Sequence, residues 1–186
     1  FTLEANKSLI FNLTGENTVA NALSGHGGVE KNGDGSMRLT AQGSDIGSMA
    51  VAAGDAVLAQ QGAFRAGTYT TQTGAATTLE SSALLNVSGT FTQQTGSTLN
   101  LSLNGDKVRA GEAMIQADSA VLGGTLDITG FDASLPASAL MANRVMVIKT
   151  TNAMNTEFSQ VSFGGALAGA DYLLLHGSRT PDNLRY

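Results

Sequence analysis

Apolar and polar residues alternate along the chain in short runs, and a glycine opens many of these runs. Three examples read GSMRLT, GSTLNLS and GTLDIT, beginning at Gly35, Gly96 and Gly124. Successive side chains of a strand point to opposite faces, so this alternation assigns one set of apolar residues to a buried face. That set is Met37, Leu39, Leu99, Leu101, Leu126 and Ile128. The polar residues Arg38, Asn100 and Asp127 then face outward, and the pattern predicts short half-buried strands joined by tight turns.

A longer repeat groups these runs into larger units. GTYTTQTGAATTL, beginning at Gly67, matches GTFTQQTGSTLNL, beginning at Gly89, with a separation of 22 residues. Repeats of roughly 20–50 residues mark solenoids and propellers, and this period suits one coil of a β-helix. Coils stacked about 4.8 Å apart pair every backbone N–H and C=O with the next coil. The sequence therefore predicts a right-handed, single-stranded parallel β-helix.

The last part of the chain has longer apolar runs than the rest. We expect a β-hairpin there, with a strand at Tyr172–Leu175, a turn over Ser178–Asn183 and a returning strand at Leu184–Tyr186. A hairpin of this kind would cover the open sheet edge of the last coil. We therefore predict one continuous domain, with coils over residues 1–142 and a capping region over residues 143–186. The best place for a short turn or helical piece is Ala133–Asn143.

Composition and charge narrow the function classes. Cysteine is absent, so disulfides and cysteine-based metal or redox sites are excluded. The net charge is -5, and the few basic residues are scattered rather than gathered into a patch. Nucleic acids and anionic membrane surfaces are therefore poor partners. No apolar stretch is long enough for a membrane-spanning helix.

The stretch from Ser24 to Val57 resembles the passenger-associated repeat of bacterial autotransporters. The matching positions are a glycine pair with the apolar residue and lysine after it, a Gly-x-Gly step with alternating Leu and Thr, and a later glycine–apolar–glycine series: Gly27, Gly28, Val29, Lys31, Gly33, Gly35, Met37, Leu39, Thr40, Gly47, Val51 and Gly54. The tail segments NRVMVIKT, FSQVSFGG and ADYLLLHG are similar to the region just before the membrane barrel in AIDA-type autotransporters.

This resemblance implies a structural role in type V secretion. In that family the tail is the C-terminal cap of the passenger solenoid, often called the autochaperone region. The expected location is the bacterial cell surface, anchored through a translocator β-barrel that this chain lacks. The expected partners are that barrel and host surfaces or neighbouring bacterial cells, with a role in adhesion or cell aggregation. The family does not imply a single activity.

Motifs for catalysis or metal binding are weak. His26 lies in a Gly-His-Gly-Gly run similar to an oxyanion-hole loop, but no Gly-x-Ser-x-Gly elbow supplies a nucleophile. His176 has no His or Cys neighbour in sequence and is better explained as a strand-end residue. Lys31–Ser36 is glycine-rich but lacks the Gly-Lys-Ser/Thr ending of a phosphate loop, so a tight turn is preferred.

A second function class is a β-helix enzyme that cleaves polysaccharides. If Leu79, Leu99 and Leu126 occupy equivalent inward positions, Glu80, Asn100 and Asp127 stack outward on neighbouring coils, and Arg38 follows Met37 in the same way. Carboxylates close together on one face can do acid–base work. Since Asn100 would separate the two acids, a solvated polar ladder is preferred. We therefore predict no enzyme, no catalytic, cofactor-binding or metal residues, and no cofactor.

Overall fold

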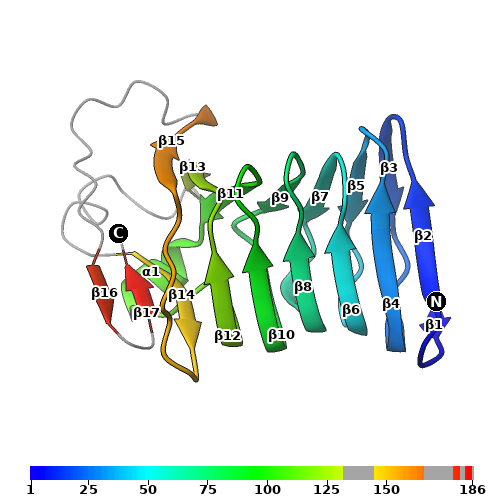
Figure 1. The fold of residues 1–186 in the computed structure, drawn as a ribbon, viewed down its shortest axis with the longest axis horizontal. Helices are drawn as coiled ribbons and strands as arrows, with labels where there is room; N and C mark the ends of the chain where they lie inside the picture. Colours follow the sequence, from blue (N-terminus) through cyan, green and yellow to red (C-terminus); the bar gives the residue numbers. More distant parts are fainter. Residues whose placement is uncertain (132–144, 166–177, 181–182, 186) are drawn as a thin grey trace.

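The chain forms a parallel β-solenoid, seen in a computed structural model that describes residues 1–131, 145–165, 178–180 and 183–185. Each coil contributes one strand to each of two sheets, which face each other across the interior (Figure 1). The ten-stranded sheet, called sheet A, runs in the order β1 (Thr2–Leu3), β4 (Ser24–Asn32), β6 (Asp45–Val51), β8 (Gly62–Thr71), β10 (Ala83–Gln93), β12 (Ile115–Leu122), β14 (Met146–Thr150), β17 (Asn183–Arg185) and β16 (Ser178–Thr180), with β2 (Ser8–Asn12) also pairing with β4.

The seven-stranded sheet, called sheet B, has one strand from each coil. In spatial order it runs β15 (Gln160–Phe163), β13 (Thr125–Phe131), β11 (Thr98–Leu103), β9 (Ala76–Leu79), β7 (Asp55–Leu58), β5 (Ser36–Leu39) and β3 (Glu16–Val19). Every pairing in this sheet is parallel. The parallel β-helix expected from the repeats is confirmed as two stacked parallel sheets, while its right-handed sense stays a prediction.

The register confirms the repeat that the sequence predicted. Tyr69 pairs with Phe91, a separation of 22 residues, and with Met49, a separation of 20. These three aromatic and apolar side chains are buried on successive coils, and the rings of Tyr69 and Phe91 lie 6.0 Å apart. The six apolar residues assigned to the buried face are all buried, which confirms the alternation.

Sheet A bends part-way along its strands, and glycines permit the bend. Register shifts occur at this level between Gly25 and Gly28 and again in β10. A Cβ added at Gly47, Gly67 or Gly89 would overlap a backbone carbonyl oxygen of the preceding coil. The backbones of neighbouring coils therefore touch directly at the bend, and only glycine fits there.

The interior is not entirely apolar. The Tyr69 hydroxyl lies 3.2 Å from Thr77 Oγ1, which lies 2.7 Å from Thr71 Oγ1. Burial raises the pKa of Tyr69 far above its ordinary value, so the phenol stays protonated. The side-chain amides of Gln60 and Gln93 are buried with no hydrogen-bond partner among the described residues. Some coils therefore bury polar side chains in the interior.

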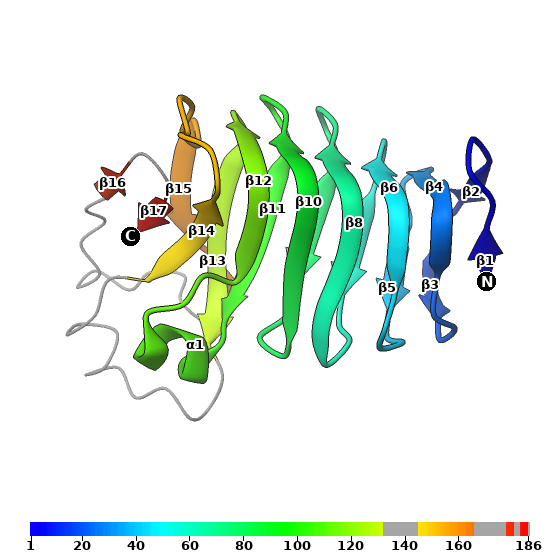
Figure 2. The same ribbon diagram turned by 90° about the horizontal axis from the view of Figure 1, so that it is seen from below.

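One helix interrupts the even coils. Helix α1 (Gly105–Ala110) lies in the connection between β11 and β12 and projects from the side of the stack (Figure 2). Asn104 caps its start by accepting a hydrogen bond from the Lys107 backbone N–H, and Gly111 ends it in the left-handed region. The sequence analysis missed this helix. The helix expected at Ala133–Asn143 lies outside the described residues.

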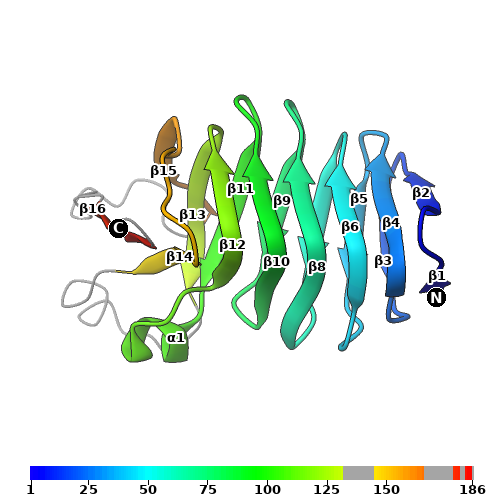
Figure 3. The same ribbon diagram turned by 60° about the horizontal axis from the view of Figure 1, so that its bottom comes forward.

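The two ends of the solenoid differ, and they lie at opposite ends of the long axis (Figure 3). At one end, β2 and β3 are edge strands, and Phe1 and Ile10 are exposed. At the other end, β17 pairs antiparallel with β14, and β16 pairs antiparallel with β17. The strand direction is thus reversed where the parallel stack ends.

The C-terminal hairpin is present, but its strands differ from those expected. The first strand is β16 at Ser178–Thr180, within the segment predicted to be the turn. The second is β17 at Asn183–Arg185, and the two are separated in sequence by two residues, the spacing of the commonest hairpins. Residues 172–175, predicted as the first strand, lie outside the described residues. Both β14 and β15 also continue the parallel sheets beyond residue 142.

Truncating a buried ladder residue should create a cavity that the stacked coils cannot close. Leu99 is fully buried, and its register partners are Thr77 and Leu126. We expect Leu99→Ala to lower the free energy of unfolding by about 2–5 kcal/mol, measured by urea denaturation. The control is Thr98, the neighbouring outward residue. Thr98→Ala should change the free energy of unfolding by less than about 0.5 kcal/mol. Equal losses for both variants would refute the inward assignment.

Candidate functional site

The outer face of sheet B carries an ion pair that skips one coil. Arg38 Nη1 donates to Glu80 Oε1 at 2.6 Å and Arg38 Nη2 donates to Glu80 Oε2 at 2.9 Å. Arg38 lies on β5 and Glu80 directly follows β9, so the guanidinium reaches across β7, past Val57, the register partner of Arg38. The hydrogen bonds to Glu80 raise the pKa of Arg38, which stays charged. This pair links three consecutive coils.

Polar side chains on the same face also bond from coil to coil. Thr78 donates to the two carboxylate oxygens of Asp55 at 3.1 and 3.0 Å, and Asn100 donates to Thr78 Oγ1 at 3.1 Å. Farther along, Ser162 donates to Asp127 at 2.7 Å. Burial raises the pKa of Asp55, although the Thr78 hydrogen bond and Lys31 oppose the shift. These side chains therefore bond to the protein itself, from one coil to the next.

This geometry corrects the expected stacking of Glu80, Asn100 and Asp127. Leu79 pairs with Leu101, not Leu99, so Asn100 stacks on Thr78 and not on Glu80. Asn100 and Asp127 are register partners as expected. The error lies in matching Leu79 with Leu99, 20 residues apart, because the 22-residue repeat places Leu79 on Leu101. Glu80 therefore meets Arg38 rather than a second carboxylate.

Lys31 is fully buried near the end of β4, beside the turn that leads to β5. Its Nζ donates to three backbone carbonyl oxygens, those of Asn32 at 3.2 Å, Gly33 at 2.7 Å and Ala53 at 2.9 Å. Burial lowers the pKa of Lys31 below its ordinary 10.5, and the charge of Asp55 opposes the shift. Gly33 has φ of 77°, so the glycine-rich segment is a tight turn held from inside.

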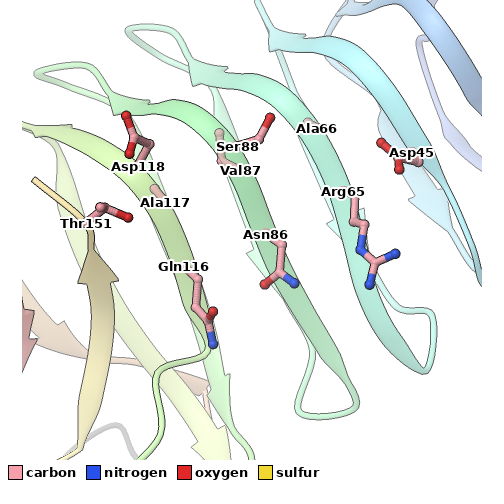
Figure 4. Close-up of a pocket in the computed structure, with 10 residues that line it drawn as sticks. All are labelled: Asp45, Arg65, Ala66, Asn86, Val87, Ser88, Gln116, Ala117, Asp118 and Thr151. Carbon is pink, nitrogen blue, oxygen red and sulfur yellow. The ribbon is translucent and has the colours of Figure 1, made fainter.

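The bend of sheet A leaves a groove on its outer face, with a volume of about 480 Å³ (Figure 4). The small residues Ala66, Val87 and Ala117 line its floor. One polar row runs along it on consecutive coils: Asp45 on β6, Arg65 on β8, Asn86 on β10 and Gln116 on β12. The register pairs Asp45 with Arg65, Arg65 with Asn86, and Asn86 with Gln116. Ser88, Asp118 and Thr151 lie on the other side of the floor.

The sequence analysis did not find this groove. Its polar row has separations of 20, 21 and 30 residues, because α1 lengthens one coil. No fixed period connects the four residues, and the bend that hollows the surface depends on bulges. The run of glycines Gly47, Gly67 and Gly89 was the available signal, since it marks the level of the bend.

The remaining candidates form no site within the described part of the chain. His26 is exposed on β4, and His176 lies outside the described residues. No group of three His, Cys, Asp or Glu side chains that could hold a metal occurs among the residues the structure describes. In the same residues, no helix is long and apolar enough to cross a membrane.

Removing the buried ammonium should destabilise the turn. We expect Lys31→Met to lower the free energy of unfolding at pH 7 by about 1–3 kcal/mol, because three carbonyl oxygens lose their donor. The folded state releases the Lys31 proton at a lower pH than the unfolded state does. The unfolded state therefore binds more protons just below pH 10.5, and the stability of the native chain rises with pH in that range.

The difference between the native chain and Lys31→Met should thus widen as pH approaches 10.5, measured by urea denaturation at several pH values. Lys7→Met is the control, because Lys7 is exposed and its substitution should give no such trend. A difference that narrows as pH rises would contradict the lowered pKa.

No protein-family model matches this chain, and no curated protein matches it either.

Proposed function

We propose that this chain is the C-terminal part of an autotransporter passenger, a structural element at the bacterial surface. In this role it nucleates folding of the passenger during secretion and supports adhesion or cell aggregation. The proposal rests on the residues that resemble the passenger-associated repeat and on the solenoid that they occupy. Lys31, Gly33 and Gly54, all part of that resemblance, meet at one turn, where a Cβ at Gly54 would lie 2.7 Å from Lys31 Nζ.

The observation that carries the proposal is the reversal of strand direction at β14 and β17. A parallel solenoid can add coils indefinitely, because each end presents unpaired N–H and C=O groups. An antiparallel strand stops that addition, since the next parallel coil finds no matching edge. The last coil then has only one open edge. The preceding coils can fold onto that edge one after another.

The hydrogen bonds between coils on the outer face of sheet B also support a scaffold role. An enzyme that cleaves polysaccharides, the second candidate, would use Glu80 or Asp127 as an acid or base. Glu80 is held by both guanidinium nitrogens of Arg38, and Asp127 accepts a hydrogen bond from Ser162. These contacts favour a structural use of both carboxylates.

If the C-terminal end nucleates folding, breaking its pairing should slow folding itself. Leu184 is the central residue of β17, which lies between β14 and β16, so its N–H points toward one of these neighbours. Proline removes that donor. We expect Leu184→Pro to slow refolding from urea by at least about tenfold, because the nucleus is lost.

The matched control breaks pairing at the other end. The Leu13 backbone N–H donates to the Asn32 carbonyl oxygen at 2.9 Å, and Leu13→Pro removes this bond. We expect Leu13→Pro to speed unfolding and leave the refolding rate nearly unchanged. Stopped-flow tyrosine fluorescence, to which the buried Tyr69 contributes, measures both rates. Equal slowing by the two prolines, or slowing only by Leu13→Pro, would reject the nucleating role.

A further inference from the structure

The groove on sheet A has a row of polar side chains without partners in the described part of the chain, although Asp118 at its other side accepts a hydrogen bond from Asn152. Among the described residues, the side chains of Asp45, Arg65, Asn86 and Gln116 form no hydrogen bond or ion pair. On sheet B, by contrast, side chains at matching outward positions bond to each other from coil to coil. The groove therefore offers a row of donors and acceptors that the protein itself leaves unused.

The chemistry of the row suits hydroxyl groups. A carboxylate accepts hydrogen bonds, a guanidinium donates them, and the amides of Asn86 and Gln116 do both. A ligand that pairs with all four must carry donors and acceptors in close alternation. Sugar hydroxyls act as donor and acceptor at the same atom, so a glycan meets this requirement.

Charge and backbone pairing exclude other polymers. Arg65 is one cation placed among the carboxylates of Asp45 and Asp118, so the lining carries no excess of positive charge. Nucleic acids and acidic polysaccharides need several cations along their length. Extended peptides bind by adding a strand to a sheet edge, and the strands under the groove are paired on both sides. The remaining class is a neutral, hydroxyl-rich chain.

We propose that this groove binds a linear neutral glycan lying along the solenoid axis, across the strands of sheet A. The four side chains of the polar row lie on consecutive coils, so they span about 14 Å at the usual spacing of about 4.8 Å. Sugars that lie along the axis meet one polar side chain after another (Figure 4). The side chains of Ala66, Val87 and Ala117 are buried in the core, so they do not project into the groove.

This inference does not depend on the autotransporter proposal, because it uses only the contacts and charges of sheet A. The glycan inference and the autotransporter proposal can also be refuted independently of each other. Refolding rates test the role of the C-terminal end, whereas ligand titration tests the groove of the folded chain.

The test is a calorimetric titration of the whole chain with three neutral oligosaccharides: cellohexaose, maltohexaose and xylohexaose. We expect at least one to bind, with an affinity that changes little with salt because no net charge is neutralised. Arg65→Ala combined with Gln116→Ala should weaken that binding by about tenfold or more. Both residues are exposed and without side-chain partners among the described residues, so the variant should keep its fold, checked by its melting temperature.

The matched control is Gln42→Ala, because Gln42 is an exposed glutamine between β5 and β6, outside the groove. Its binding should equal that of the native chain. The proposal is overturned if none of the three oligosaccharides binds at millimolar concentrations. It is also overturned if the double variant binds as well as the native chain. Salt-sensitive binding of polygalacturonate in place of the neutral sugars would overturn the assignment to a neutral glycan.

Discussion

Each coil of this protein is completed by the backbone of its neighbour, and the other features depend on that pairing. The coils can stay in register only if they approach equally closely along their whole path. At the bend of sheet A the backbones of neighbouring coils touch directly, because Gly47, Gly67 and Gly89 have no side chain to hold them apart. A larger residue there would separate the coils and weaken pairing in both sheets. The inward ladders, the outward polar rows and the groove all follow from this close contact.

Local alternation made much of the fold predictable. Met37 and Leu39 are buried on either side of Arg38 because a strand has a fixed period of two, and that period is visible in any short run. The repeat from Gly67 to Gly89 likewise predicted which coils stack, since both glycines occupy the same level of the bend. A mainly parallel structure with a turned-back end follows from these patterns together with the need to cover a sheet edge.

Features that depend on coil length were not predictable in the same way. The position of Glu80 is a different case, because the 22-residue repeat itself matches Leu79 with Leu101, and the error lay in matching Leu79 with Leu99. The capped helix at Gly105–Ala110 escaped notice because its few residues show no apolar period, although Asn104 and Gly111 are good capping residues. The groove was not predictable either, because bulges shape it and an insertion displaces Gln116 along the sequence.

The Arg38–Glu80 pair has a mechanical consequence. A chain pulled from one end of the stack peels off coil by coil, because only the end coil has a free sheet edge. A bond between neighbouring coils does not change this sequence of events. Arg38 reaches past β7 to Glu80, so a crack that opens on either side of β7 must also stretch this bridge. At an exposed position the Arg38–Glu80 pair adds little to equilibrium stability. It nevertheless spreads tension over two rungs and slows the separation of the coils.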